Sequence, residues 1–177
     1  PATLMSISIG ILLGVKIGAN PGSRLDVSLM AVALMLYSIP TFWLQVLLKA
    51  LFTTQIEIWP YKGGLFSGAQ EIPDPLLAFI DAFYMMLLPI ATLVLASFAG
   101  WMLLMRGSLM DVMGEDYILT ARAKGLDESI VLYKHAFRNA ILPVVTSVVL
   151  SIAFVWTGAV ITETIFAIPG LGRVLLQ

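Results

Sequence analysis

The sequence predicts an all-α membrane protein, a polytopic bundle of transmembrane helices with a helix-elbow-helix loop outside the lipid. Three observations support this fold class. First, 59% of the 177 residues are hydrophobic, only 12% are charged, and the mean hydropathy is +0.96, whereas soluble domains carry roughly 25% charged residues. Second, long apolar runs recur along the chain. Third, one polar segment between two of these runs is dense in charge.

Four apolar runs are long enough, or nearly so, to cross a bilayer, which takes about 20 helical residues. They comprise residues 2–17, 27–52, 83–105 and 141–162. We expect four spans in a single transmembrane domain over residues 1–177. Because the chain begins with Pro1 and ends at Gln177 inside what reads as a continuing segment, we expect it to be a fragment that lacks both ends.

Basic residues distinguish the two sides of the predicted bundle. Alternation puts the connections after the first and third spans on one side, which holds Lys16, Arg24, Arg106, Arg122, Lys124, Lys134 and Arg138. The other side holds only Lys62 and Arg173. Since basic residues favour the cytoplasmic side, we expect residues 106–140 to form a cytoplasmic loop and residues 53–82 to be external.

The third connection contains a charged island over residues 116–143, which reads DYILTARAKGLDESIVLYKHAFRNAILP. Each Asp, Lys or Arg at the bilayer centre costs about 2.5–3.5 kcal/mol. The six such residues that we count in the island are Asp116, Arg122, Lys124, Asp127, Lys134 and Arg138. Burying them in lipid would cost roughly 15–20 kcal/mol, so the island must lie in water.

The island itself predicts two helices joined by a sharp elbow. Residues 116–124 are compatible with a short helix, and Gly125 stands where a C-terminal cap with positive φ would end it. Asp127 can cap the second helix, with Glu128 favourably placed in its first turn. Helical spacing predicts that the apolar face of this second helix consists of Ile130, Tyr133, Phe137 and Ile141.

The first of these helices has a slim surface, because Thr120, Ala121 and Ala123 are small. Such a helix can insert into a groove on another protein. A solvated loop that happens to be helical is the alternative, and composition alone favours that alternative.

Glycine and proline positions indicate how the spans pack. Gly10, Gly14 and Gly18 repeat every four residues, which allows a neighbouring backbone to approach this helix closely. Pro40 and Pro89 each remove a backbone donor, so we expect a kink at both positions.

Several kinds of site are absent from the sequence. The chain has no cysteine, and its single histidine, His135, has no partner at metal-ligand spacing, so no metal or cofactor is expected. The phosphate-loop pattern GxxxxGK[ST] does not occur, so the chain is not expected to be an enzyme that hydrolyses ATP. The net charge of −1 gives no indication of a nucleic-acid partner.

Two other classes of membrane protein fit less well. An intramembrane enzyme needs a nucleophile with a base inside a span, and the serines of the spans have no evident His or Lys partner. An ion-coupled secondary transporter usually carries ionisable residues inside its spans. The spans here are nearly free of charge, with Lys49 near a helix end.

The segment TARAKGL followed by HAFRNAILPVV resembles the cytoplasmic EAA loop of binding-protein-dependent ABC importer permeases, in the form typical of dipeptide and oligopeptide permeases. The similarity continues through SIPTFWLQVLL, LLPIATLVLASFAGWMLLMRGSLMDVMGEDYI and GAVITETIFAIPGLGRVLL, so it covers nearly the whole chain. Leu119, Thr120 and Ala121 replace the Glu-Ala-Ala of the general motif, and the gap from Gly125 to Pro143 is longer. Both departures favour the peptide branch over sugar or phosphate importers.

The resemblance implies a multi-pass permease subunit in a prokaryotic inner or plasma membrane, where it pairs with a second permease as a homodimer or heterodimer. The implied partners are an external solute-binding protein and cytoplasmic ABC ATPases, which would bind ATP and Mg²⁺. Docking onto the ATPases is implied for Tyr117, Thr120, Ala121, Arg122, Ala123, Lys124 and Gly125. Peptides are the implied solute, and chelated nickel or another solute is the alternative.

Overall fold

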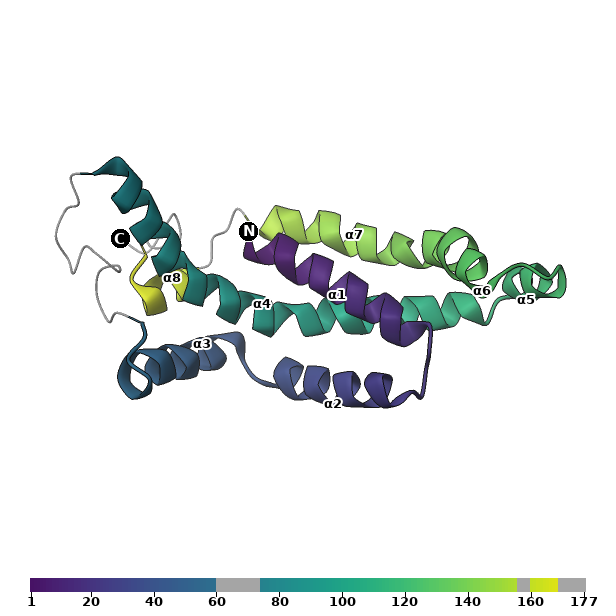
Figure 1. Ribbon diagram of the computed structural model, residues 1–177, viewed down its shortest axis with the longest axis horizontal. Coiled ribbons are helices and arrows are strands. Elements are labelled where there is room, and N and C mark those ends of the chain that lie inside the picture. Colours follow the sequence, from purple (N-terminus) through teal and green to yellow (C-terminus); the bar gives the residue numbers. More distant parts are fainter. Residues whose placement is uncertain (60–73, 156–159, 169–177) are drawn as a thin grey trace. The chain divides into compact units, whose positions relative to one another are not determined.

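The computed structural model describes residues 1–59, 74–155 and 160–168, and every regular element in these ranges is helical (Figure 1). The predicted all-α class is therefore confirmed for the described residues. Two compact units divide the chain. Unit 1 comprises Pro1–Ala2, Ile39–Ala96 and Thr157–Gln177, and unit 2 comprises Thr3–Ser38 and Ser97–Trp156.

Unit 2 begins with α1 (Ala2–Gly18), which packs against α4 (Pro75–Met113). A Cβ added to Gly14 would lie 2.7 Å from both the backbone oxygen and the side chain of neighbouring residues on α4, namely Met102 and Met105. A Cβ at Gly18 would lie 3.1 Å from the side chain of Leu109. The close backbone approach predicted from the glycine spacing is thus confirmed.

The main hydrophobic core of unit 2 joins α1 and α4 to the segments that follow α4. Its buried members are Val15, Met105, Leu109, Ile118, Ala121, Val131, Ala136, Ala140 and Val144. A second buried cluster in the same unit contains Ile17, Ala33, Ala99 and Met102. The charged island is therefore fixed to α1 and α4 by apolar contacts from both of its halves.

The second predicted span, residues 27–52, is interrupted rather than continuous. Helix α2 spans Arg24–Ser38, α3 spans Thr41–Ala50, and a π-helical turn η1 follows over Leu51–Gln55. Pro40 is the N-cap of α3. Proline disfavours a helical conformation for the residue before it and donates no backbone hydrogen bond, so the predicted kink is a complete break.

Helix α4 is much longer than the predicted span over residues 83–105. Its 39 residues correspond to roughly 58 Å at 1.5 Å per residue, and it runs through Pro89 without ending. Asp74 precedes the helix, and its Oδ1 accepts a hydrogen bond of 2.9 Å from the N–H of Leu76. The predicted external connection is thus helical over Pro75 to Ala82, while residues 60–73 lie outside the described part of the chain.

The helix after the elbow buries only part of the face that the sequence predicted. It consists of α6 (Glu128–Ile130), a π-helical segment η2 (Val131–Ala136) and α7 (Phe137–Val155). Phe137 and Ile141 are partly buried and pack against the core, as predicted, whereas Ile130 is 42% exposed and Tyr133 is 62% exposed. The fully buried positions are instead 131, 136, 140 and 144. A π-helical turn holds one more residue than an α-helical turn. The residues that follow it are therefore rotated about the helix axis relative to a regular α-helix.

Two helical segments among the described residues are long and apolar enough to cross a membrane, Pro75–Met113 and Glu128–Ile152. A third is obtained if α2 and the segment Thr41–Gln55 count as one span. Helix α1 is apolar and has 17 residues. The last predicted span, residues 141–162, corresponds to most of α7 and the start of α8 (Val160–Phe166). Residues 156–159 lie outside the part of the chain that the structure describes. Four spans remain a prediction.

Unit 1 contains α3, the first part of α4 and α8. The buried amide of Gln45 on α3 donates a hydrogen bond of 2.8 Å to the hydroxyl of Thr162 on α8. Near the other end of α3, the ammonium of Lys49 donates to the carbonyl of Ile165. These two polar contacts join α3 to α8.

Candidate functional site

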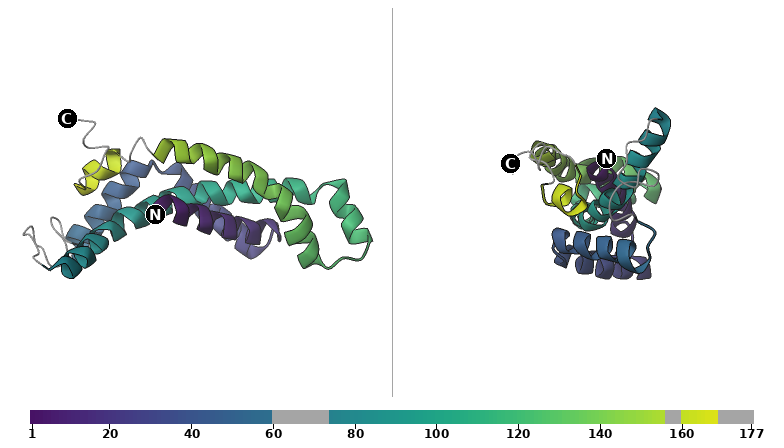
Figure 2. Two further views of the ribbon diagram at one scale, coloured as in Figure 1. Left: turned by 90° about the horizontal axis from the view of Figure 1, so that it is seen from above. Right: turned by 90° about the vertical axis from the view of Figure 1, so that its left-hand side faces the viewer.

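The candidate site is α5 (Asp116–Ala123), which lies with α6 and η2 at one end of unit 2 (Figures 1 and 2). The chain leaves α4 at Met113 and enters α5 through an extended Glu115. After α5 it turns back through the elbow at residues 124–127 into the second helix. The structure thus contains the predicted helix, elbow and second helix, and the cytoplasmic location of this loop remains a prediction.

Gly125 ends α5 in the conformation that the sequence predicted. Its φ is +75°, a region that side-chain-bearing residues enter at a cost. The N–H of Gly125 donates to the carbonyl of Arg122 at 2.9 Å, and the N–H of Leu126 donates to the carbonyl of Ala121 at 3.4 Å. This pair of bonds is the Schellman arrangement, which satisfies the last carbonyls of a helix.

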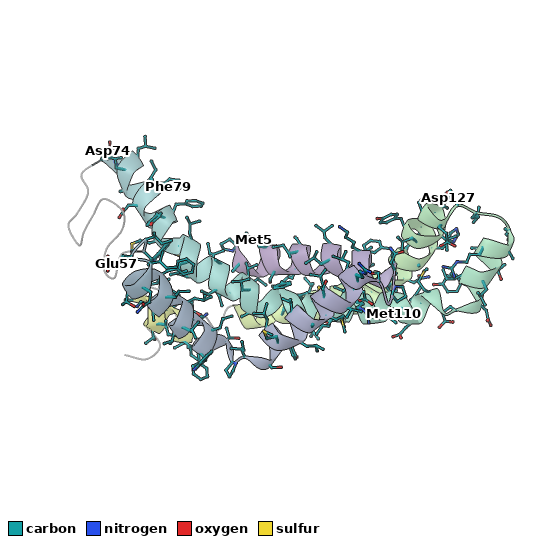
Figure 3. The ribbon with its side chains drawn as sticks, turned by 60° about the horizontal axis from the view of Figure 1, so that its bottom comes forward. Met5, Glu57, Asp74, Phe79, Met110 and Asp127 are labelled. Atoms are coloured by element: carbon teal, nitrogen blue, oxygen red, sulfur yellow. The ribbon has the colours of Figure 1, made fainter. Side chains whose placement is uncertain are left out.

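Asp127 caps the second helix, as predicted. Its Oδ1 accepts a hydrogen bond of 2.8 Å from the backbone N–H of Ser129, and Figure 3 shows Asp127 at the same end of unit 2 as α5. Hydrogen bonds from Ser129 hold the pKa of Asp127 below its usual value. The carboxylate therefore stays ionised at neutral pH and continues to act as an acceptor for the helix N-terminus.

An ion pair connects the two sides of the elbow. The Nε of Arg122 on α5 donates to Oε1 of Glu128 at 2.7 Å, and its Nη2 donates to Oε2 at 3.2 Å. The hydrogen bond to Glu128 raises the pKa of Arg122. Exposed pairs contribute at most about 1 kcal/mol to stability, so this contact helps to set the geometry of the elbow and contributes little to overall stability.

Two further contacts fix the start of α5. The side-chain amide of Asn139 on α7 donates a hydrogen bond of 2.8 Å to the hydroxyl of Tyr117. The hydroxyl of Thr120 donates to the carbonyl of Asp116 within the helix at 3.0 Å. Both ends of α5 are therefore attached to the second helix, one through Tyr117 and the other through Arg122.

The seven predicted docking residues do not share one environment. Ala121 is 6% exposed and belongs to the core together with the fully buried Ile118. Its side chain therefore packs on the buried face of α5 and is not available to a partner. The other six are exposed: Tyr117, Thr120, Arg122, Ala123, Lys124 and Gly125. Of these, Tyr117 and Arg122 are engaged by Asn139 and Glu128, which leaves Thr120 and Ala123 on the outward surface of α5, with Lys124 and Gly125 directly after its end.

Sequence reasoning did not identify two apolar residues on this surface, Leu119 and Leu126, which are 55% and 37% exposed. The signal was present, because a leucine in a segment that must face water is a candidate for contact with a partner protein. The role of Asn139 as a partner of Tyr117 depends on a contact across 22 positions, and no local pattern reveals it.

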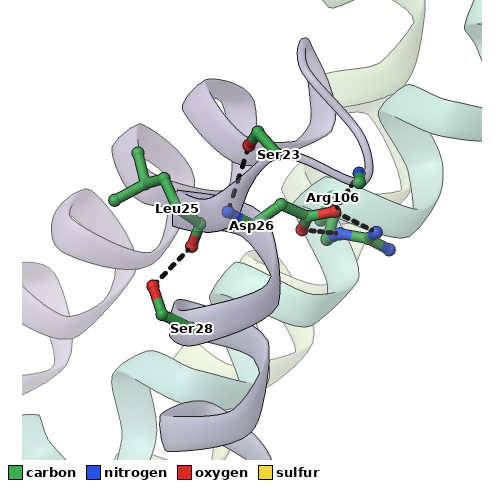
Figure 4. Close-up of polar contacts among 6 residues, drawn as sticks. Ser23, Leu25, Asp26, Ser28 and Arg106 are labelled. Carbon is green, nitrogen blue, oxygen red and sulfur yellow. Dashed lines mark hydrogen bonds and ion pairs between the residues drawn. The ribbon is translucent and has the colours of Figure 1, made fainter.

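A second polar feature of unit 2 joins the predicted first and third connections. Arg106 on α4 donates from Nε to Oδ1 of Asp26 at 2.7 Å and from Nη2 to Oδ2 at 2.8 Å (Figure 4). Oδ2 also accepts a bond of 2.8 Å from the N–H of Gly22, and the Asp26 N–H donates to the Ser23 hydroxyl at 3.2 Å. The side chain of Asp26 is only 3% exposed.

The part of the chain that the structure describes holds no group of three or more His, Cys, Asp or Glu placed to bind a metal ion. The polar groups of α5 and the elbow are instead used for caps, for an ion pair and for a tyrosine–asparagine bond. The result is a short helix that is packed against the core on one face and exposed to solvent on the other.

Over residues 6–177 the chain matches the family described as binding-protein-dependent transport system inner membrane component. The dipeptide transport system permease protein of Escherichia coli is 37% identical over 191 residues, which cover 99% of this chain and 56% of the relative. The di/tripeptide transport system permease protein of Pseudomonas aeruginosa is 37% identical over 189 residues, with 99% and 56% covered. The oligopeptide transport system permease protein of Bacillus subtilis is 33% identical over 176 residues, with 99% and 54% covered. The chain thus spans about half the length of these relatives.

Proposed function

Because the chain belongs to the binding-protein-dependent transport system inner membrane components, we propose that it is part of the permease subunit of an ATP-driven importer. In this proposal α5 docks onto a cytoplasmic ATPase subunit and transmits its movement to the membrane helices. The observation that carries the proposal is the construction of α5, an eight-residue helix with a buried underside and an exposed outer face. ATP and Mg²⁺ are bound by the partner, because the chain has no phosphate-loop pattern.

The docking role requires a rigid element. Moving a two-state pore from 1:99 to 99:1 takes about 5.5 kcal/mol of differential binding, so the contact must transmit a few kcal/mol without yielding. Four features give α5 that rigidity: the apolar contacts of Ile118 and Ala121, the Schellman turn at Gly125, the Arg122–Glu128 pair and the Tyr117–Asn139 bond. A flexible loop would absorb the same displacement.

The proposed topology has four spans, with residues 106–140 in the cytoplasm and residues 53–82 outside. The excess of basic residues in the first and third connections supports this orientation. Further support comes from the Asp26–Arg106 pair, because it joins these two connections at one end of unit 2. The pore then forms when this subunit pairs with a second permease, and an external binding protein delivers the solute.

Peptides are the proposed solute. The relatives described above carry dipeptide, di/tripeptide and oligopeptide transport in their names, and they agree with the peptide-type form of the loop around Gly125. This support favours peptides over chelated nickel, which the sequence alone left open, and over ion-coupled transport.

The proposal is tested with two charge reversals in the full-length permease, assembled with its partners in proteoliposomes. Lys124→Glu changes the outer end of α5, whereas Arg24→Glu makes the same change of charge at an exposed residue of the first connection. We expect Lys124→Glu to reduce copurification of the ATPase subunit and peptide uptake by at least about 10-fold, which corresponds to 1.4 kcal/mol. Arg24→Glu is expected to keep both. Equal behaviour of the two variants would remove the docking assignment.

A further inference from the structure

Unit 2 has a groove between the C-terminal half of α1 and the start of the helix that follows the elbow. Its cavity volume is about 550 Å³, and it is partly open. The α1 side contributes Leu12, Lys16 and Asn20, and the opposite side contributes Leu132, Tyr133 and Phe137. The groove lies apart from the outward surface of α5, and its role does not depend on docking to an ATPase.

The groove has an apolar stretch and a polar end. Lys16 lies in the last turn of α1 and is exposed, and Asn20 follows one turn later. Helix α1 runs toward the loop end of unit 2, while η2 and α7 run away from it (Figure 1). Lys16, Asn20 and Tyr133 therefore belong to the end of the groove nearest the loops, and Leu12 and Phe137 belong to the part farther along the membrane helices.

The lining of the groove carries a net positive charge. Lys16 is the one charged residue among the lining residues, all of which lie in the described part of the chain. Its ammonium offers donors to an anion, and the amide of Asn20 and the hydroxyl of Tyr133 can donate as well. A cation at the end of an apolar channel, in a member of an inner membrane family, fits a molecule with one anionic head and a long apolar tail.

We propose that this groove binds an anionic phospholipid, with its phosphate at Lys16 and an acyl chain that enters the membrane along Leu12 and Phe137, where the proposed cytoplasmic loop ends and the last span begins. Basic pockets between transmembrane helices at the cytoplasmic surface are suited to such head groups, and tyrosine is favoured at the membrane–water interface. A free phosphate ion would use Lys16 but gain nothing from the apolar walls. An apolar protein helix would cover the walls but gain nothing from the ammonium of Lys16.

The test uses the full-length permease complex, reconstituted without nucleotide and with lipids that carry a photoactivatable group in the acyl chain. One preparation contains the phosphatidylglycerol analogue and the other the phosphatidylcholine analogue. We expect the phosphatidylglycerol analogue to label the peptides around Leu12 and Phe137 about 5-fold more strongly, which corresponds to about 1 kcal/mol for one basic residue near the membrane surface. The Lys16→Ala variant is expected to remove this preference.

Two further variants test separately the charge of Lys16 and the free volume of the groove. Arg24→Ala removes an exposed cation of the same connection that does not line the groove, and it should keep the preference for phosphatidylglycerol. Ala19→Trp places a large side chain in the groove, whose lining includes Ala19, and should reduce labelling by both lipids. These two results distinguish occupation of the groove from general attraction of anionic lipid to a basic surface.

Three results would overturn the proposal. The first is equal labelling by the two lipids, with no effect of Lys16→Ala. The second is loss of labelling when inorganic phosphate alone is added, which identifies a site for a soluble anion. The third is crosslinking of the groove to another protein segment, with no lipid adduct. None of these results depends on ATPase docking, so failure here leaves the proposed function intact.

Discussion

Arg106 on α4 holds the carboxylate of Asp26, 80 positions earlier in the chain, through two hydrogen bonds of 2.7 and 2.8 Å. The carboxylate also caps the turn before α2, because it accepts a bond from the N–H of Gly22, whose φ is +77°. One buried side chain therefore fixes the turn between α1 and α2 and attaches that turn to α4. Both ends of this contact lie in unit 2, which also carries α5.

Loss of either partner of the Asp26–Arg106 pair is expected to destabilise the protein. Removing one member of a fully buried ion pair costs about 3–5 kcal/mol, because the other charge is left without compensation. The loss here should be smaller, because the side chain of Arg106 is 18% exposed. Asp26→Asn and Arg106→Gln should each lower the thermal unfolding temperature of the purified complex, as measured by size-exclusion chromatography after heating. The double variant should lose less stability than the sum of the two single variants. Additive losses would show that the two side chains do not interact.

The glycines of α1 give a second prediction, with a control on the neighbouring helix. A Cβ at Gly14 would approach the carbonyl oxygen of Met102 to 2.7 Å, whereas a Cβ at Gly107 on α4 would meet nothing within 4 Å. Gly14→Ala should therefore separate α1 from α4 and lower the unfolding temperature. Gly107→Ala should leave it unchanged or raise it, since alanine is favoured over glycine in a helix by about 1 kcal/mol. The same melting measurement compares the two, and an equal response of both variants contradicts the packing described here.

Substitution of Gly125 should uncouple the ATPase while leaving the membrane helices in place. A residue with a side chain pays about 1–2 kcal/mol in the left-handed conformation, and a β-branched residue is a more severe outlier there. Gly125→Val is therefore expected to break the end of α5. Membrane insertion should be normal, and uptake per ATP hydrolysed should fall.

Gly125→Asn is the matched control, because asparagine tolerates positive φ better than other side-chain-bearing residues. It should retain most of the coupling. Uptake and ATP hydrolysis are measured on the same proteoliposomes, which gives the number of peptides taken up per ATP hydrolysed for each variant. A normal ratio in Gly125→Val would argue against a mechanical role for the elbow.

A glutamate introduced at two neighbouring alanines of α5 should have two different effects. Ala121 is buried beside Ile118, so Ala121→Glu places a carboxylate in the core and should loosen α5 from the second helix. Ala123 is exposed, so Ala123→Glu should preserve the loop and only weaken contact with the ATPase. Limited proteolysis of the purified permease without its ATPase subunits distinguishes the two outcomes, because no docked partner then shields the loop: cleavage near residues 116–127 should increase for Ala121→Glu alone. Increased cleavage in both variants would mean that the outer face is also structural.

The sequence predicted the elements that depend on local signals. Gly125 and Asp127 are a C-terminal and an N-terminal cap, and each cap depends on only a few neighbouring residues. The glycine repeat of α1 likewise predicts close helix packing directly, because glycine has no side chain to keep a neighbouring helix away. The start of α4 also had a local signal that was not used. Asp74 followed by Pro75 is a cap residue followed by proline at the first helical position, and it places the helix start eight residues before the predicted one.

Other features could not be obtained from a regular helical pattern. The π-helical segment η2 changes the spacing of the buried residues to five positions between Val131 and Ala136, so a search with the ordinary helical period selects Tyr133 instead. The Asp26–Arg106 pair and the Tyr117–Asn139 bond connect residues that are distant in the chain. Burial of Ala121 likewise follows from contact with η2, and its small size alone suggested an exposed position.

Docking of α5 onto the ATPase is tested most directly by site-specific crosslinking from the outer face of this helix in the assembled transporter. These 177 residues contain no cysteine, so Ala123→Cys introduces one thiol at an exposed position of the helix, and Arg24→Cys serves as the control on the first connection. With a short thiol-reactive crosslinker, Ala123→Cys is predicted to join the permease to the nucleotide-hydrolysing subunit, with a yield that changes when ATP is bound, whereas Arg24→Cys is not. The ATPase must be present in the complex for this test. If Ala123→Cys then reacts only with lipid or with the quenching reagent in solution, α5 does not dock onto the ATPase.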